Sequence, residues 1–147
     1  MPLCFTHVGL LPEIPTGYHD VYGKCTESEP KVAVFYAITT PTSGVEGLSL
    51  GNILIVGAAN RLGVDVPSLE EFCTMSPIPG FKRYLEALPK EEQPDLTDKD
   101  AMMKTCANYL AHEKRNKGAL DPVANFHLAN GAEMGTLHWQ ADTSESG

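Results

Sequence analysis

The sequence predicts a mixed α/β or α+β fold built around a mixed β-sheet. Segments with strand character alternate with segments of helical spacing along the chain. Residues 32–39 (VAVFYAIT) are apolar at consecutive positions, which is typical of a central strand covered on both faces. An antiparallel return is expected late in the chain, around a turn at Asn130 and Gly131. The chain has 147 residues, the length of one domain.

The first half of the chain is predicted to begin with two strands and a helix. Residues 2–10 (PLCFTHVGL) have strand character, and a loop rich in turn residues follows over 12–30. After the central strand, a glycine-bearing turn over residues 41–51 opens a helix. We expect that helix from about residue 52 to 62. Its apolar stripe consists of Ile53, Leu54, Ala58 and Leu62.

The segment TMSPIPGF places Ser76 on stiff backbone at the end of a further strand, expected over residues 67–75. Proline fixes its own φ and pushes the residue before it into an extended conformation, so Ser76 cannot easily be helical. The apolar spacing after Gly80 predicts a helix that starts at Phe81. Open α/β proteins place binding and catalytic groups at such strand ends. The competing interpretation is that Ser76 simply caps the next element.

A helix with clear end signals is predicted in the second half. Thr97 is the expected N-cap, with Asp98 and Asp100 in the first turn. The apolar face of this helix consists of Met102, Met103, Cys106, Tyr109 and Leu110. The basic residues expected to mark its C-terminal end, before Gly118, are Lys114, Arg115 and Lys117.

Residues 121–139 are predicted to be extended, with a turn near Asn130 and then another strand. In an extended segment, alternate side chains point to opposite faces. His127 would therefore point away from the apolar face that Phe126 and Leu128 share.

Composition and charge exclude several classes of function. The net charge of −8 argues against nucleic acid or an anionic membrane as the main partner. No apolar run approaches membrane-spanning length, and no basic region precedes the N-terminal apolar stretch, so we expect neither a membrane span nor a targeting signal. Four cysteines without paired spacing favour a reduced compartment, and Cys73 and Cys106 are expected in the core. Cys4 and His7 have a ligand-like interval, but without a second pair no metal site is expected.

Three features are candidates for a functional site. The turn between Gly44 and Gly51 suits a phosphate, because glycines expose backbone N–H groups and the following helix adds positive potential. It matches neither the Walker loop nor the GxGxxG pattern. Ser76 and His127 come from separate elements and could meet as nucleophile and base, although no GxSxG elbow surrounds the serine. Taken alone, the turn is better explained as an ordinary loop, and a lone histidine is more often structural than catalytic.

Taken together, four segments resemble one family. GVEGLSLGN, MSPIPGF, LDPVANFHLANGA and W-x-A-D-T-S resemble the catalytic domain of malonyl-CoA decarboxylases in order and spacing, from about residue 2 to 144. The resemblance implies a GNAT-type acetyltransferase fold. By position, the active-site serine of the family falls on Ser76 and its proton-donating histidine on His127. The CoA-binding turn of the family falls on Glu46, Gly47, Leu48, Ser49, Leu50, Gly51 and Asn52.

The chain also departs from the family pattern. Members carry a helical domain before this region and more catalytic-domain chain after the D-T-S segment, so the resemblance implies a partial domain over residues 1–147. Thr136 and His138 stand where the strand before the tryptophan usually carries an Arg and an Asn. One alternative is therefore a truncated homologue that binds CoA esters and turns over little or nothing.

The resemblance implies decarboxylation of malonyl-CoA to acetyl-CoA and CO2, a reaction of fatty acid metabolism. Loss of CO2 leaves an enolate whose electron sink is the thioester carbonyl of the substrate, so no metal or organic cofactor is expected. Ser76 would orient the carboxylate and thioester, and His127, with an ordinary pKa of about 6.5, would protonate the enolate. A second alternative is a thioesterase or acyltransferase that acts through Ser76.

The expected partners are malonyl-CoA and acetyl-CoA, with no nucleic acid and no membrane, and a homo-oligomer stays open. The basic residues available to contact the CoA phosphates are Lys82, Arg83, Lys114, Arg115 and Lys117. For the last three, a position at a helix C-terminus explains the charge equally well. The expected location is intracellular, in the cytoplasm or, in a eukaryote, the mitochondrion or peroxisome.

Overall fold

The computed structural model describes residues 4–23, 27–39 and 50–143. They fall into two compact units. The first unit comprises the described residues of Met1–Ser76 together with those of Ala141–Ser146, and the second is Pro77–Gln140. Ser76 is therefore the last residue of the first unit before the chain enters the second.

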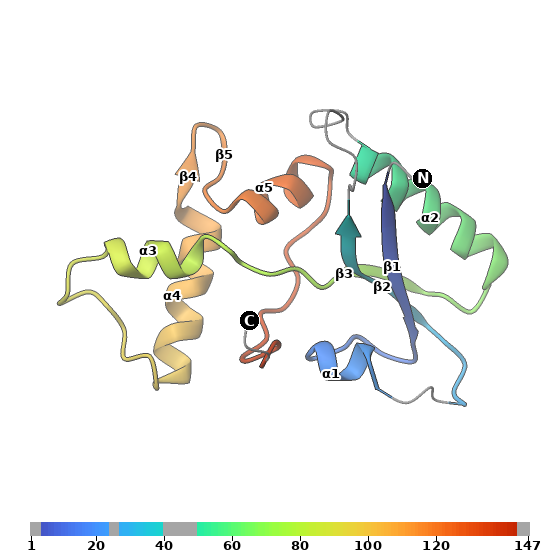
Figure 1. Cartoon of the computed structure of the whole chain (residues 1–147), viewed down its shortest axis with the longest axis horizontal. Helices are drawn as coiled ribbons and strands as arrows, with labels where there is room; N and C mark the ends of the chain where they lie inside the picture. Colours follow the sequence, from blue (N-terminus) through green and yellow to red (C-terminus); the bar gives the residue numbers. More distant parts are fainter. Residues whose placement is uncertain (1–3, 24–26, 40–49, 144–147) are drawn as a thin grey trace. The chain divides into compact units, whose positions relative to one another are not determined.

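A mixed three-stranded sheet forms the centre of the first unit, as the sequence predicts (Figure 1). Its strands are β1 (Phe5–Leu11), β2 (Val32–Thr39) and β3 (Glu71–Thr74), in the order β1-β2-β3. β1 pairs with β2 antiparallel, with a bulge between His7 and Val8, and β2 pairs with β3 parallel. The first four residues of β2 are all buried, so both faces of this central strand are covered.

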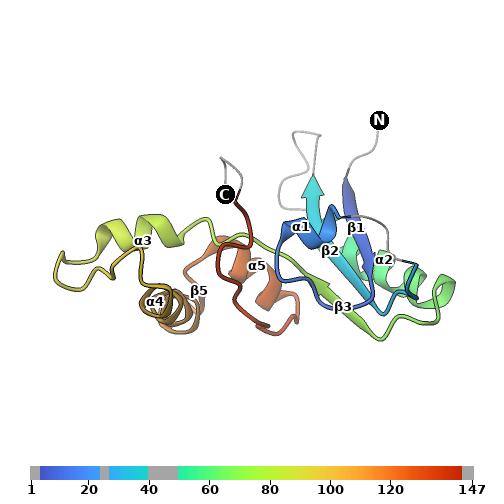
Figure 2. The ribbon, with the colours of Figure 1, turned by 90° about the horizontal axis from the view of Figure 1, so that it is seen from below.

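Two helices accompany this sheet. The helix α2 (Leu50–Asp65) contacts β1 and β2 and connects the parallel strands β2 and β3 (Figures 1 and 2). It begins two residues before the expected start and ends three residues beyond the expected end. The short helix α1 (Tyr18–Val21) lies in the stretch predicted to be a loop. It lies close to β1, where a Cβ atom built on Gly9 would lie 3.3 Å from the Val21 side chain.

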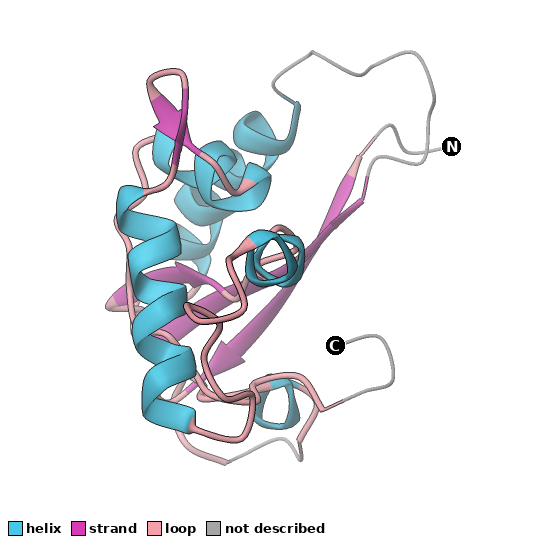
Figure 3. Cartoon of the chain, turned by 90° about the vertical axis from the view of Figure 1, so that its left-hand side faces the viewer, coloured by secondary structure: helices cyan, strands magenta, loops and turns pink. Residues whose placement is uncertain are grey.

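The second unit contains three helices and a small hairpin. In chain order they are α3 (Phe81–Ala87), α4 (Lys99–His112), β4 (Lys114–Arg115), β5 (Gly118–Ala119) and α5 (Pro122–Ala129). The antiparallel hairpin follows directly from the C-terminal end of α4 (Figure 3). The core of this unit is formed by Cys106, Tyr109 and Leu110 of α4. The partly buried apolar residues packed against it are Ile78, Phe81, Tyr84, Ala124 and Leu137.

The predicted ends of α4 are wrong at both termini. Asp98, one residue after the expected Thr97, is the N-cap, and its carboxylate accepts a hydrogen bond from Ala101 N at 3.0 Å. The Thr97 hydroxyl donates to Asp95 instead. The helix ends at His112, so the basic residues at 114, 115 and 117 lie in the hairpin and do not complement a helix C-terminus.

The segment predicted to be extended from residue 121 is a helix. Asp121 caps α5, Pro122 occupies its first position, and Gly131 follows its end with a φ of +86°. Within the described part of the chain, residues 132–139 form no strand, so the expected antiparallel return there is wrong. The antiparallel pairing of the sheet comes from β1 instead.

Candidate active site

Ser76 lies two residues beyond the end of β3, where the chain leaves the sheet. The Met75 N–H donates to the Phe35 carbonyl at 3.0 Å, which extends the pairing with β2 one residue past the strand. Ser76 is exposed, and its hydroxyl donates to Thr74 Oγ1 at 3.2 Å. The structure therefore confirms that the serine stands at a sheet end on backbone that the sheet holds in place.

The stiff backbone after Ser76, residues 77–80, forms an elbow that is fixed at its far end by Gly80. The Gly80 N–H donates to Asp121 Oδ2 at 3.0 Å, and α3 begins at the next residue. Gly80 has an ordinary helical φ of −81°, so its conformation does not require glycine. The space around this position does require glycine, because a Cβ atom built there would overlap the Tyr109 hydroxyl and lie 3.0 Å from Asp121 Oδ2.

Asp121 receives hydrogen bonds from three parts of the second unit. Besides Gly80 N, it accepts from Val123 N and Ala124 N at the start of α5, both at 3.0 Å to Oδ1. The Tyr109 hydroxyl of α4 is also hydrogen-bonded to it. Asp121 is 1% exposed and is the buried charged residue of the described chain. In the sequence, Asp121 lies within the LDPVANFHLANGA segment without an assigned role, and the Asp-Pro pair is the local signal that a helix starts there.

His127 lies in the last turn of α5, not on the extended segment that the sequence predicts. Its backbone carbonyl accepts from Asn130 N and Ala132 N, both at 3.1 Å, at the C-terminal end of the helix. The imidazole is half-buried, and the Phe126 ring meets it edge-on at a centroid distance of 5.1 Å. Burial lowers the pKa of His127 below its ordinary 6.5. The imidazole is therefore mainly neutral at pH 7, and its protonated form is a stronger acid than free histidine.

The predicted CoA-binding turn lies largely outside the described residues. Of its seven residues, Glu46, Gly47, Leu48 and Ser49 fall there. Leu50, Gly51 and Asn52 form the first turn of α2. The first turn of a long helix carries unpaired N–H groups and positive potential, which suits a phosphate. The assignment of this turn to CoA stays a prediction.

The basic candidates for phosphate contact are exposed. Lys82 and Arg83 lie on α3, and the residues at 114, 115 and 117 lie in and around the hairpin. Arg83 is near enough to Tyr109 to oppose the rise in its pKa, which burial and then Asp121 cause. All five side chains belong to the second unit.

A cavity of about 610 Å³ lies within the first unit. Its lining residues are Tyr18, His19, Tyr22, Tyr36, Ala141, Asp142 and Thr143. The A-D-T-S segment joins this wall through a hydrogen bond from Tyr18 N to the Ala141 carbonyl at 2.9 Å. Among the described lining residues there is a carboxylate, Asp142, and no Lys or Arg, so this part of the lining does not favour CoA phosphates.

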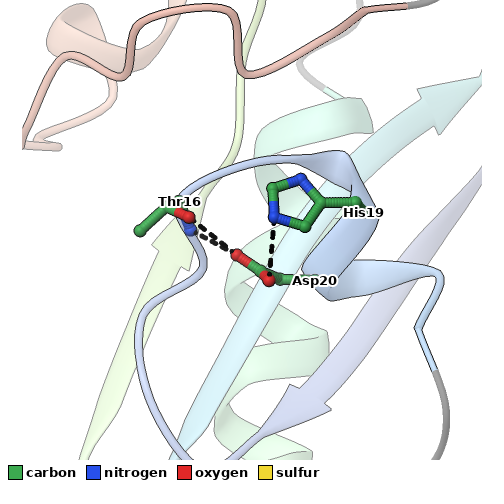
Figure 4. A network of polar contacts seen from close by, with 3 residues as sticks. All are labelled: Thr16, His19 and Asp20. Atoms are coloured by element: carbon green, nitrogen blue, oxygen red, sulfur yellow. Dashed lines mark hydrogen bonds and ion pairs between the residues drawn. The ribbon is translucent and has the colours of Figure 1, made fainter.

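The helix next to this cavity, α1, is held by a small polar network (Figure 4). Asp20 Oδ2 accepts from the Thr16 backbone N–H at 2.8 Å and from its hydroxyl at 2.9 Å. His19 Nε2 lies 3.2 Å from Asp20 Oδ1. The Thr16 hydrogen bonds hold the pKa of Asp20 below its ordinary value. All three side chains are used in local structure.

The described residues contain no group of three or more His, Cys, Asp or Glu side chains that could hold a metal ion. Burial, with a smaller effect of Asp121, raises the pKa of the Cys106 thiol to about 11, so it is not a nucleophile at neutral pH. Among the described helices, none is long and apolar enough to cross a membrane. Ser76 and His127 remain the candidate reactive side chains.

Comparison with known proteins identifies relatives that match nearly the whole chain. It matches the malonyl-CoA decarboxylase C-terminal domain family over residues 1–103 and 97–147. The mitochondrial malonyl-CoA decarboxylases of Anser anser anser and Rattus norvegicus are 32% and 30% identical to it over 99% of its length. The chain spans only 39% and 40% of those relatives.

Solved structures agree with these matches. The crystal structure of malonyl-CoA decarboxylase from Cupriavidus metallidurans has a TM-score of 0.81 and 29% identity, covering 100% of this chain and 45% of that one. The enzyme from Rhodopseudomonas palustris has a TM-score of 0.78 and 29% identity, covering 99% and 40%. The mixed α/β fold predicted from the sequence is confirmed by these structures.

The relatives contain an internal segment that this chain lacks. The alignments span 195 positions, more than the 147 residues of the chain, and the family match divides at residues 97–103. This division lies between the SPIPGF and DPVANFHL segments, near the start of α4. The two segments keep the family order, but the spacing expected from the resemblance is wrong.

All four segments that carry the resemblance lie within the matched residues, and the matches leave no large part of the chain unaccounted for. The chain belongs to the malonyl-CoA decarboxylase family and corresponds to its C-terminal domain.

Proposed function

We propose that this chain decarboxylates malonyl-CoA to acetyl-CoA and CO2 within a GNAT-like catalytic domain. The observation that carries the proposal is the family match over the whole chain, which includes both the Ser76 and the His127 segments. The names of the relatives support the substrate. No metal or organic cofactor takes part in the proposed reaction, since the thioester carbonyl accepts the electrons. We place the reaction inside the cell, because the matched relatives are named as mitochondrial.

In the proposed reaction, the bond between the carboxylate carbon and the α-carbon breaks and its electron pair enters the thioester as an enolate. The carboxylate leaves as CO2, and the α-carbon then takes one proton to give the acetyl thioester. The Ser76 hydroxyl orients the carboxylate out of the plane of the thioester carbonyl. Its position directly after the sheet gives it the small conformational freedom that orientation requires.

His127 supplies the proton. Half-burial makes its protonated form a stronger acid, which favours transfer to the enolate, and makes that form less abundant at pH 7. If the imidazolium is the donor, turnover should increase as the pH decreases toward the pKa of this histidine. We assign binding of the CoA portion to the predicted turn over residues 46–52, of which Leu50, Gly51 and Asn52 form the start of α2 and offer backbone N–H groups.

A second candidate function is binding of CoA esters without turnover. It is favoured by one observation: the chain lacks an internal segment that its relatives contain. The bound molecule would be the same thioester, at the same turn. A binding protein of this kind would also keep the fold and the order of the segments.

Product analysis with malonyl-CoA separates the candidates. The proposed reaction gives acetyl-CoA and CO2 in equal amounts. An unchanged substrate together with measurable binding would favour the binding protein, and free CoA with malonate would indicate a thioesterase acting through Ser76. A variant with Ser76 changed to Ala controls for contaminating activity, because it should reduce all turnover that depends on this site. Mass spectrometry of the quenched protein should find no acyl group on Ser76, since decarboxylation needs no acyl transfer.

A further inference from the structure

We propose that Asp121 is a positioning residue that fixes the backbone following Ser76 to the helix that carries His127. This inference rests on the proposed function, because Asp121 joins the backbone that follows Ser76 to the helix that carries His127. Nothing in the sequence motif itself assigns the carboxylate a role. The contacts of Asp121 supply the argument.

The hydrogen bonds of Asp121 exceed what a helix cap needs. A carboxylate offers about four acceptor positions, and Asp121 receives N–H bonds from Gly80, Val123 and Ala124 as well as the bond with Tyr109. Only the bonds from residues 123 and 124 are cap bonds. In the same unit, the N-cap Asp98 of α4 is exposed and accepts from Ala101 N alone. Asp121 therefore has a second function, which is to hold the Gly80 amide.

Fixing Gly80 also restricts the serine. Only three residues separate Gly80 from Ser76, and two of them are prolines, so little backbone freedom remains between the two positions. At its other oxygen, Asp121 fixes the start of α5, and His127 follows six residues later, roughly 9 Å along the helix axis. Loss of the Gly80 bond would loosen the backbone that follows Ser76, and loss of the cap bonds would loosen the start of the helix that carries His127.

The variant Asp121→Asn tests this role with little change in shape. An amide has one acceptor oxygen, so its NH2 group must face either Gly80 N–H or the cap N–H groups of α5, and one set of bonds is lost. Asn is as good an N-cap as Asp, so we expect the cap to persist and the Gly80 bond to be lost. Asp121→Ser is the second variant, because a serine oxygen can cap α5 but cannot reach both partners.

Two control variants separate positioning from stability. Asp98→Asn makes the same chemical change at an exposed cap with no contact to the elbow. Leu110→Ala destabilises the same core without removing a hydrogen bond, since Leu110 is 5% exposed and packs beside Tyr109. All variants are compared at a temperature at which each is folded by circular dichroism.

The first readout is amide hydrogen exchange followed by NMR, which needs no activity. In Asp121→Asn the Gly80 amide should exchange roughly tenfold faster or more, while Val123 and Ala124 stay protected. The second readout is decarboxylation: kcat should decrease roughly 10- to 100-fold with KM within about twofold. The pH at which activity is half-maximal should stay the same, because the burial of His127, and not the charge of Asp121, lowers its pKa.

The outcomes distinguish the two proposals. If the Gly80, Val123 and Ala124 amides all keep wild-type exchange rates in both Asp121 variants, Asp121 does not fix the elbow. If kcat decreases no more than in Leu110→Ala, its effect is only one of stability. If the wild-type chain forms no acetyl-CoA, the proposed function fails, and the exchange rates alone decide whether Asp121 holds the two elements together.

Discussion

Gly80→Ala is the most direct test of the packing around the elbow. A methyl group at this position would overlap the Tyr109 hydroxyl and come within 3.0 Å of Asp121 Oδ2. Tyr109 cannot easily move away, because the residue is 2% exposed. Its ring centroid lies 4.7 Å from that of Tyr84 and 5.8 Å from that of Phe81. The substitution should therefore displace the elbow, the tyrosine, or both.

The size of the effect follows from opposing contributions. Overpacking a filled site costs about 1–3 kcal/mol, and a weakened hydrogen bond between Gly80 N and Asp121 adds about 1 kcal/mol. Replacing glycine by alanine recovers about 0.4–1 kcal/mol by restricting the unfolded chain. A net loss of about 1–3 kcal/mol remains, which for a chain of this length lowers the melting temperature by roughly 3–9 °C.

Gly57→Ala is the matched control, because a Cβ atom built on Gly57 of α2 meets nothing within 4 Å. This variant should be more stable than the wild type by about 0.5–1 kcal/mol. Urea unfolding of both variants by circular dichroism compares the free energies. Adding Tyr109→Phe removes the overlapping hydroxyl, so the double variant Gly80→Ala/Tyr109→Phe should lose less than the sum of the two single changes. Equal stability of Gly80→Ala and the wild type, or strict additivity with Tyr109→Phe, would refute the overlap.

Three further predictions concern the ligand and His127. Malonyl-CoA and acetyl-CoA should each raise the melting temperature, and Gly51→Val at the start of α2 should reduce that shift by blocking approach to the backbone; no shift at saturating concentrations of either ester would remove the assigned CoA site. His127→Asn should lower kcat roughly 100- to 10,000-fold with little change in binding, and near-normal turnover would leave the histidine a structural role. Because burial holds the pKa of His127 below 6.5, the unfolded chain takes up this proton first as the pH decreases, so wild-type stability should decrease from about pH 6.5 until the folded pKa is passed. When stability is measured by chemical unfolding between pH 5 and 7.5, the His127→Asn variant should lack this contribution to the decrease. An identical pH dependence in both proteins would show that His127 is not desolvated.

The parts of the fold that the sequence predicts correctly depend on local rules. The four buried residues that begin β2 form an uninterrupted apolar run, and such a run has few alternatives to a covered central strand. The elbow after Ser76 is likewise set by the prolines themselves, whose φ angles are fixed by covalent structure. In both cases the deciding information lies within a few consecutive residues.

The incorrect predictions have two different causes. Residues 122–129 contain apolar side chains at so many positions that neither the helical period of about 3.6 residues nor the strand period of about two stands out. Only the Asp-Pro start and Gly131 identify the helix. At α4, two capping residues stand side by side, and Asp98 becomes the cap because Thr97 is already bonded to Asp95. Pattern alone does not rank such alternatives.

The role proposed for Asp121 could not be predicted from local pattern, because its partner Gly80 is 41 residues away in the sequence. A buried carboxylate is costly unless its oxygens are paired, so its presence in a small core calls for all of its hydrogen bonds. A glycine that leaves room for close approach and a tyrosine that reaches the carboxylate from the core supply two of these hydrogen bonds, and the prolines stiffen the elbow that the glycine ends. Each is ordinary in its own segment. Their combined effect is to hold the backbone after Ser76 and the start of the His127 helix through one side chain, and in the proposed reaction such positioning of the chain would contribute to the rate.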